Sequence, residues 1–323
     1  MVMKNRWIII VNVFAASKKA GAYWSRTESL LKAGSVDYKC FITGVDGNAC
    51  DLAREAAKAG YRRLVAVGGD GTVHDVLNGI MEYVDGPDAS ADGVSLNDFT
   101  LAVLPSGSGN DWIKSTGVPK DISEAVKMFV NGSFIRQDVA RVQTLDGYGA
   151  TSIRSYMVNI GGTGIDADVC RVVNVNKKLG YRGKILYVTA LLRCLAKRRP
   201  VAVRVLCDGE VVYDGNILSI AYGIGRYSGG GMRQTADAVL DDGLLDVTII
   251  PDLPLMTIAR KAPRLFTGTF TKVKELVVSR CRKVEVVPYV NCPYTEVDGE
   301  VIGQIPLCVE VLDGQLNVLG VKR

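Results

Sequence analysis

The feature that most constrains this sequence is a short apolar run, Leu64–Val67, that ends in the glycine-rich turn Gly68-Gly69-Asp70-Gly71-Thr72. Glycines let a backbone come close to a phosphate group, and a helix that begins near Val73 adds the positive end of its dipole. Because Asp70 would repel a phosphate, we interpret it as a group that holds Mg²⁺ or a metal-bound water. The alternative is an ordinary helix start with a capping aspartate; the preceding strand and a second loop of this kind favour phosphate binding.

The second loop runs from Pro105 to Asp111 and again follows an apolar run directly. Ser108 is a candidate contact for a phosphate or a metal-bound water, whereas helix capping is the favoured role for Asp111. No Gly-Lys-Ser/Thr follows either set of glycines, so the Walker pattern is absent, and no Gly-x-Gly-x-x-Gly follows the first apolar run. A dinucleotide-binding dehydrogenase is therefore disfavoured.

The first 135 residues alternate between short apolar runs and segments with helical spacing. Strands buried on both faces that alternate with helices predict a parallel sheet, which binds ligands at the carboxyl ends of its strands. The segment Asp85–Asn97, rich in Asp, Gly and Ser, predicts a surface loop. The expected strands are Trp7–Val13, Val36–Ile42, Arg63–Val67 and Thr100–Leu104, and the expected helices are about Ala22–Ala33, Asn48–Lys58, Val73–Met81 and Ile122–Phe129.

After about residue 135 the pattern becomes β-rich, with turn signals at Asp208-Gly209, Asp214-Gly215 and Asp298-Gly299. This spacing predicts a sandwich or barrel, interrupted by one helix around Lys184–Lys197. The boundaries are therefore residues 1–135 for an α/β domain and 136–306 for a β-rich domain, and the sequence leaves open whether residues 307–323 return to the first. The expected strands are Ser155–Ile160, Val201–Leu206, Glu210–Tyr213, Asn216–Tyr222, Leu244–Ile250, Lys283–Pro288 and Leu307–Leu312.

Charge and cysteine usage restrict the partners. The net charge of +5 suits an anionic ligand or membrane surface and is too small for a dedicated nucleic-acid binder. The 8 cysteines form no Cys-x-x-Cys pair, which favours reduced thiols in a cytoplasmic protein. From Cys170 to Cys207 there is no acidic residue, and the basic, apolar helix there suits peripheral contact with an anionic membrane. Packing of its apolar face on the second domain is the alternative, and both can hold at once.

Several of these blocks together resemble the diacylglycerol kinase catalytic domain superfamily, which also includes sphingosine kinases and, more distantly, NAD kinases. The turn Gly68–Thr72, followed by Asn78-Gly79, and the loop Pro105–Asp111 are similar to that family's two glycine loops. Three further blocks resemble the soluble bacterial lipid kinases in particular, and they occur in the same order along the chain. These are Asn159–Asp166, then Gly229–Met232 with Asp241–Asp246, and finally Asp298–Glu300.

This resemblance implies a two-domain kinase, with nucleotide held between an α/β domain and a β-sandwich, that transfers the γ-phosphoryl group of Mg-ATP to a lipid alcohol such as diacylglycerol. Asp70 would serve the phosphates and the metal, and Glu300 would be the catalytic base that accepts the alcohol proton. Without the resemblance, Asp298-Gly299-Glu300 reads as a hairpin turn, and the two interpretations are compatible. The backbone carbonyls of Val239 and Leu244 and the Asp242 carboxylate match a structural Mg²⁺ site. The implied ATP contacts are Asn12, Val13, Phe14, Ala15, Ala16, Thr43, Gly69, Asp70, Gly71, Thr72, Val73, His74, Asp75 and Ser108.

The sequence departs from the family pattern in its first loop, where Asn12–Ala16 lacks the usual proline and final glycine. Ser108 stands where threonine is common, and Asp75 stands where glutamate is usual. We still expect an active enzyme, since Asp70 and Glu300 are both present. The alternatives are a kinase of sphingoid bases or other lipids, an NAD kinase, and a weakened nucleotide- or lipid-binding regulator. Acyl-chain preference and homodimer formation stay open.

Overall fold

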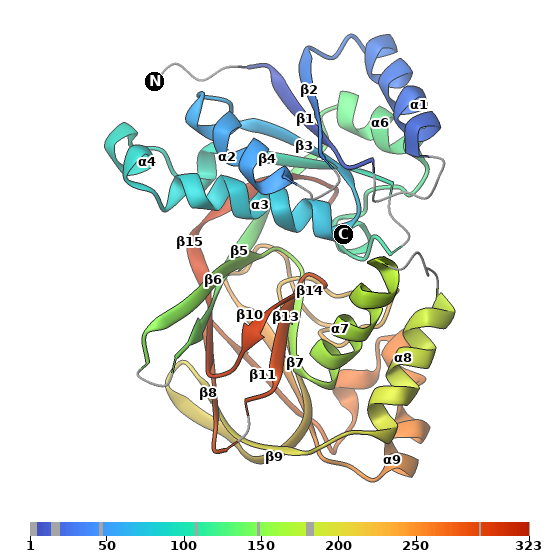
Figure 1. The fold of residues 1–323 in the computed structure, drawn as a ribbon, viewed down its shortest axis with the longest axis vertical. Helices are drawn as coiled ribbons and strands as arrows, with labels where there is room; N and C mark the ends of the chain where they lie inside the picture. Colours follow the sequence, from blue (N-terminus) through green and yellow to red (C-terminus); the bar gives the residue numbers. More distant parts are fainter. Residues whose placement is uncertain are drawn as a thin grey trace. The chain divides into compact units, whose positions relative to one another are not determined.

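The structure is a computed structural model that describes residues 5–13, 20–44, 48–106, 109–146, 149–178, 184–290 and 292–322. The chain forms two compact units: residues 1–137 with 313–323, and residues 138–312. Two long strands, β5 (Phe134–Leu145) and β15 (Leu307–Leu319), belong to both units along their lengths. Figure 1 shows both units with most of their elements labelled.

The first unit is built on parallel strands in the order β4 (Thr100–Pro105), β3 (Arg63–Gly68), β1 (Trp7–Val11) and β2 (Tyr38–Ile42). The interior residues of β1, β3 and β4 are buried on both faces, as expected for a sheet covered by helices. The parallel α/β arrangement predicted from the sequence is thus confirmed, although the first strand ends at Val11 rather than Val13.

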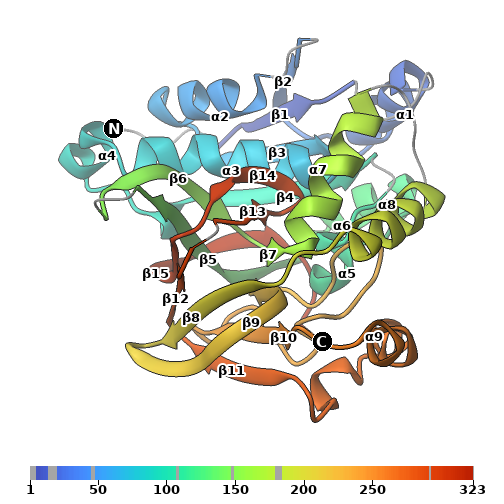
Figure 2. The same cartoon turned by 60° about the horizontal axis from the view of Figure 1, so that its bottom comes forward.

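Helices pack on this sheet in two pairs. α2 (Ala49–Lys58) packs against α3 (Asp70–Val84), and α1 (Ala20–Ala33) packs against α6 (Ile122–Val130). Right-handed crossovers between parallel strands place these pairs on opposite faces of the sheet, which can be followed in Figure 2. A shorter helix, α5 (Trp112–Thr116), follows β4.

The segment Asp85–Asn97 was expected to be a loop, and this prediction is wrong in part. It contains the short helix α4 (Pro87–Asp92) and the start of a 3-10 turn, Leu96–Asp98. Pro87 at the first helical position and Gly93 in the left-handed conformation after the last begin and end this helix. A helix of 6 residues is too short to show a helical period in the sequence.

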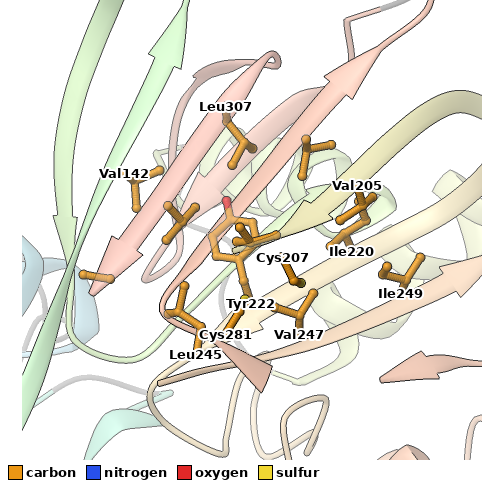
Figure 3. Packing of buried hydrophobic residues seen from close by; sticks show 14 of the residues in the cluster. Val142, Val205, Cys207, Ile220, Tyr222, Leu245, Val247, Ile249, Cys281 and Leu307 are labelled. Carbon is orange, nitrogen blue, oxygen red and sulfur yellow. The ribbon is translucent and has the colours of Figure 1, made fainter. Parts of the chain in front are cut away.

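The second unit is a β-rich domain, as predicted. Its antiparallel path runs β14-β13-β7-β9-β8-β12, with β10 and β11 added beside β9 and with β5 paired to β6. Figure 3 shows its core, in which Tyr222, Leu245 and Leu307 are buried among β-branched side chains. The strands are β6 (Thr151–Met157), β7 (Ile160–Gly164), β8 (Val201–Cys207), β9 (Glu210–Gly223), β10 (Leu245–Pro251), β11 (Val277–Cys281), β12 (Lys283–Pro288), β13 (Tyr294–Val297) and β14 (Glu300–Gln304).

Helices in this unit include one that was predicted and several that were not. α8 (Lys184–Ala196) confirms the helix expected around Lys184–Lys197, whereas α7 (Ile165–Lys178), α9 (Leu255–Lys261) and α10 (Arg264–Thr267) were not anticipated. No helix within the described ranges is long and apolar enough to cross a membrane.

Two strand predictions in this unit need correction. Asp214-Gly215 is not a turn, because both residues pair with β8, Arg204 facing Asp214 and Val203 facing Gly215, so that β9 is continuous. The strand expected at Ser155–Ile160 is divided between β6 and β7. The division falls at Val158 and Asn159, whose backbone N–H groups donate to the Asp298 carboxylate at 3.1 and 3.0 Å.

Candidate functional site

The carboxyl ends of the parallel strands bring the predicted phosphate loops together in the first unit. Gly68 and Pro105, at the ends of β3 and β4, are register partners, and the Ser106 N–H donates to the Gly68 carbonyl at 2.9 Å. On the other side of β3, the Asn12 N–H donates to the Val67 carbonyl at 3.0 Å. The loops after β1, β3 and β4 therefore begin at one edge of the sheet, where α/β proteins bind ligands.

Close packing explains the glycine at the start of the first loop. A Cβ atom at Gly68 would lie 2.2 Å from the Thr72 hydroxyl oxygen, so no other residue fits there without displacement. Gly69 is the N-cap of α3, and its carbonyl accepts the Thr72 N–H at 3.0 Å. The Asn12 side-chain amide donates to the Thr72 hydroxyl at 3.2 Å. This links the loop after β1 to the first turn of α3.

Asp70 joins the two glycine loops. One of its carboxylate oxygens accepts the backbone N–H of Asp111 at 3.0 Å, and the other accepts that of Trp112 at 3.2 Å. It therefore satisfies N–H groups at the start of α5, a role that the sequence interpretation did not include. Asp111 occupies the N-cap position of α5, but its side chain makes no capping bond and instead pairs with Lys114.

Val13 and Gly71 are half-buried, and the other predicted nucleotide contacts fall into three groups. Val73 and His74 are buried, so that they would meet a ligand mainly through their backbone, and Asp75 is half-buried. Thr43 follows β2, and its N–H donates to the Val11 carbonyl at 2.9 Å. A third group lies outside the described residues: Phe14, Ala15, Ala16 and Ser108.

Glu300 lies directly after a tight hairpin turn in the second unit. Asp298 and Gly299, at the centre of the turn between β13 and β14, have φ values of 52° and 90°. Positive φ at both central positions is typical of the turns that suit a twisted hairpin. The hairpin predicted at Asp298-Gly299-Glu300 is confirmed, and the side chain of Glu300 is exposed.

Two buried carboxyl groups near this hairpin were given no role from the sequence, although Asp166 ends the block Asn159–Asp166. Burial raises the pKa of Glu296 well above its usual value, and the neighbouring acids Asp166, Asp298 and Glu300 add to the rise. Burial also raises the pKa of Asp166, although the Ser219 hydroxyl at 2.5 Å and the Gln234 amide at 2.9 Å donate to it. Only the position of Glu296 two residues before Asp298, on the same strand, could have drawn attention to it.

The residues of the predicted structural cation site have protein partners of their own. One oxygen of Asp242 accepts the Leu244 N–H at 3.1 Å, and the other pairs with the Arg280 guanidinium. Arg280 also reaches Asp246 at 3.2 Å. These contacts do not involve the backbone carbonyls of Val239 and Leu244, and the Mg²⁺ site implied at Val239, Asp242 and Leu244 stays a prediction. Within the described ranges, no cluster of three or more His, Cys, Asp or Glu side chains is placed to hold a metal.

Comparison with known families finds one domain family that matches the first part of the chain and another that matches the second. Residues 6–142 match the diacylglycerol kinase catalytic domain, and residues 159–320 match the YegS C-terminal NAD kinase beta sandwich-like domain. The two matches follow one another along the chain, as the parts of a two-domain lipid kinase. The chain belongs to the family of diacylglycerol kinases and YegS-like lipid kinases.

Individual relatives agree with this assignment. A "Probable lipid kinase YegS-like" of Stenotrophomonas maltophilia is 27% identical over 97% of this chain and 95% of its own. A diacylglycerol kinase of Mycobacterium tuberculosis strain H37Rv is 28% identical over 90% of this chain and 86% of its own. The crystal structure of a diacylglycerol kinase from Bacillus anthracis, 19% identical, covers 98% of this chain and 96% of its own with a TM-score of 0.69, which supports the fold. The resemblance inferred from the sequence, and the fold class that it implied, are thus confirmed.

Proposed function

We propose that this lipid kinase transfers the γ-phosphoryl group of Mg-ATP to a hydroxyl group of diacylglycerol or a closely related lipid alcohol. The observation that carries the proposal is the pair of glycine loops at the ends of β3 and β4, held together by Asp70. ATP is the phosphoryl donor that the catalytic family implies. Diacylglycerol is the acceptor named for several relatives at 25 to 28% identity.

The backbone around Gly69–Thr72 would bind the phosphates. Its N–H groups lie at the start of α3, where the helix dipole favours negative charge. Asn12 would fix the loop through Thr72, and Asp70 would keep the second loop beside the first. Mg²⁺ bound with ATP would neutralise charge on the phosphates during transfer. Phe14–Ala16 and Ser108 stay proposed contacts by their place in the family pattern.

Glu300 would accept the proton of the lipid hydroxyl as the new oxygen–phosphorus bond forms. A carboxylate at the tip of a hairpin is exposed and yet held on a rigid turn, which suits a general base. Such help is typically worth about 10²–10⁴ in rate. The reaction leaves ADP and a phosphorylated lipid.

A surface of unit two offers the basic and apolar character that a membrane-borne substrate requires. Val188 and Leu192 on α8 are 56% and 61% exposed, and Met256 on α9 is 73% exposed. Arg198 after α8 pairs with Asp252 before α9 at 3.5 Å, which links the chain segments next to the two helices. We propose that these helices contact an anionic bilayer while the protein takes up its lipid. The exposed basic side chains among them are Arg193, Lys197, Arg199, Arg260 and Arg264.

The experiment that tests the function is a radiolabelled-ATP assay against a dispersed total lipid extract, followed by separation of the labelled lipids. A labelled phosphatidic acid identifies diacylglycerol as the acceptor. A labelled sphingoid base or other lipid would show that this lipid, and not diacylglycerol, is the acceptor. Glu300→Gln should abolish labelling and spare ATP binding, which calorimetry measures. If purified protein binds ATP but labels neither a lipid nor added NAD, the proposal is wrong and a regulator is favoured.

A further inference from the structure

The turn that carries Glu300 is held from one side by helix α7. The Asn174 side-chain amide donates to the Gly299 carbonyl at 2.9 Å, and the Cys170 thiol donates to the same oxygen at 2.9 Å. Asn174 and Cys170 are four residues apart on α7, so both project from one face of the helix. The Asn174 amide also lies 3.4 Å from the Glu300 carboxylate.

The other side of the same turn is held by a buried acid. The Gly299 N–H donates to the Glu296 carboxyl at 2.9 Å. Both peptide groups that flank Gly299 are thus fixed. Glu296 accepts the Gly299 N–H, and the α7 side chains donate to the Gly299 carbonyl. Gly299 has the freest backbone of any residue type, and without these bonds its two peptides could rotate.

The peptide between Gly299 and Glu300 determines where the Glu300 side chain points, since Glu300 is the first residue of β14. We propose that Asn174 is a positioning residue for Glu300: it fixes this peptide and reaches the carboxylate, so that the base meets the lipid hydroxyl in a productive orientation. This inference rests on the proposed role of Glu300. Asn174 has no role in the sequence motifs described above.

The expected effect follows from the geometry of proton transfer. Displacement of a catalytic group by about 1 Å can cost about 10²-fold in rate. Asn174→Ala removes the donor to both oxygens, and we expect kcat to fall about 10- to 100-fold, within that limit. The KM for ATP should not change, because the candidate nucleotide contacts belong to other elements. Asn174→Asp keeps the shape but places a carboxylate against the Gly299 carbonyl and Glu300, and it should lose at least as much.

The chain offers a matched control on the same helix. Asn176 is half-buried like Asn174, but its amide donates to the Val172 carbonyl within α7 at 2.8 Å. Asn176→Ala removes the same side chain from the same helix and should leave kcat within about twofold of wild type, since general-base catalysis does not depend on it. Asn174→Gln, which keeps an amide donor, should recover part of the kcat lost in Asn174→Ala.

The assay measures ADP release with Mg-ATP and a dispersed total lipid extract, together with the thermal midpoint of each variant. A fall in kcat for Asn174→Ala and Asn174→Asp, at unchanged ATP KM and with no fall for Asn176→Ala, supports the inference. Near-normal kcat in the two Asn174 variants, or an equal fall in Asn176→Ala, overturns it. Glu300→Gln distinguishes a failure of the Asn174 inference from a failure of the proposed role of Glu300. If that variant remains active, the assignment of Glu300 as the base is itself wrong.

Discussion

At the scale of single residues, Glu296 couples the stability of the hairpin to pH. Its pKa lies well above the usual 4.5 in the folded protein because the carboxyl is buried and other acids are near. The unfolded chain therefore releases this proton at lower pH than the folded one. The stabilisation from Glu296 is present in full below the pKa that the group has in the unfolded chain. It is lost as the pH rises through the pKa that the group has in the folded protein.

Glu296→Gln tests this coupling, since glutamine is neutral at every pH and its side-chain oxygen can still accept the Gly299 N–H. Between the two pKa values the wild type should lose about 1.4 kcal/mol per pH unit relative to the variant. Urea unfolding from pH 4.5 upward measures the difference. Curves that run parallel for the two proteins would contradict the prediction.

Asp70 combines a structural and a chemical role at the same carboxylate. Asp70→Asn retains one acceptor oxygen but turns an amide donor toward a backbone N–H of Asp111 or Trp112. Loss of one charge-assisted hydrogen bond should lower the unfolding free energy by about 1.5–3 kcal/mol, and turnover should fall with it. Urea unfolding and ADP release measure the two effects. Asp88→Asn, at an exposed site on α4, is the control. Equal losses of stability and turnover in both variants would contradict the dual role of Asp70.

At the scale of elements, the contact between α2 and α3 depends on a glycine. A Cβ atom at Gly79 would lie 2.1 Å from the Cys50 carbonyl oxygen and 2.8 Å from the Ala53 Cβ, so the two helices approach too closely for a side chain. Backbone atoms cannot move aside as the end of a flexible side chain can. This explains a glycine in the middle of a helix, where it is intrinsically unfavourable.

Gly79→Ala and Gly21→Ala form a matched pair for this contact. In α1, Gly21 is the second residue of the helix and has nothing within 4 Å of a new Cβ atom, so alanine there should add up to about 0.5 kcal/mol of stability through helix propensity. In α3, overpacking should outweigh that gain and cost about 1–3 kcal/mol. Thermal unfolding of the two variants shows whether each substitution stabilises or destabilises the protein. A stabilised Gly79→Ala protein would mean that α2 can move away at little cost.

The elements that could be predicted are those whose signals are local. The parallel strands are continuous apolar runs, and the Asp298-Gly299 hairpin follows from two adjacent residues that favour positive φ. The bond between Asp70 and Asp111 spans 41 residues of sequence, so no local pattern reports it. Asp214-Gly215 has the composition of a turn, but pairing with β8 keeps it extended. No local pattern reports the role of Asn174 either, because its partner in the hairpin lies 125 residues away in the sequence.

At the scale of the whole molecule, each unit carries a different part of the proposed chemistry. The first holds the candidate phosphate-binding turns, and the second holds the candidate base and the helices α8 and α9. On α8, Val188 and Leu192 are four residues apart and form one exposed apolar stripe. Arg193 and Lys197, also four apart and exposed, lie beside it. Ala190 on the same helix is buried, so α8 also packs on its own domain, whereas membrane contact by the exposed stripe stays a prediction.

Substitutions on this stripe should separate membrane contact from catalysis. Val188→Asp with Leu192→Asp should reduce the protein fraction that sediments with anionic vesicles, since it adds two negative charges and removes the apolar side chains. Each basic residue near an anionic surface contributes about 1 kcal/mol, so Arg193→Gln with Lys197→Gln should weaken binding by about 2 kcal/mol, an effect that disappears at high salt. Val211→Asp, at a site 53% exposed on β9, is the control.

Activity on a short-chain, water-soluble diacylglycerol distinguishes the two roles. If α8 serves only to reach the bilayer, both double variants should retain turnover on the soluble substrate and lose it on vesicles. The Val211→Asp variant should behave like the wild type in both assays. Unchanged sedimentation of both double variants on vesicles with anionic lipid would show that another surface of the protein meets the membrane. Equal loss on soluble and vesicle substrate would place α8 in lipid binding itself rather than in docking.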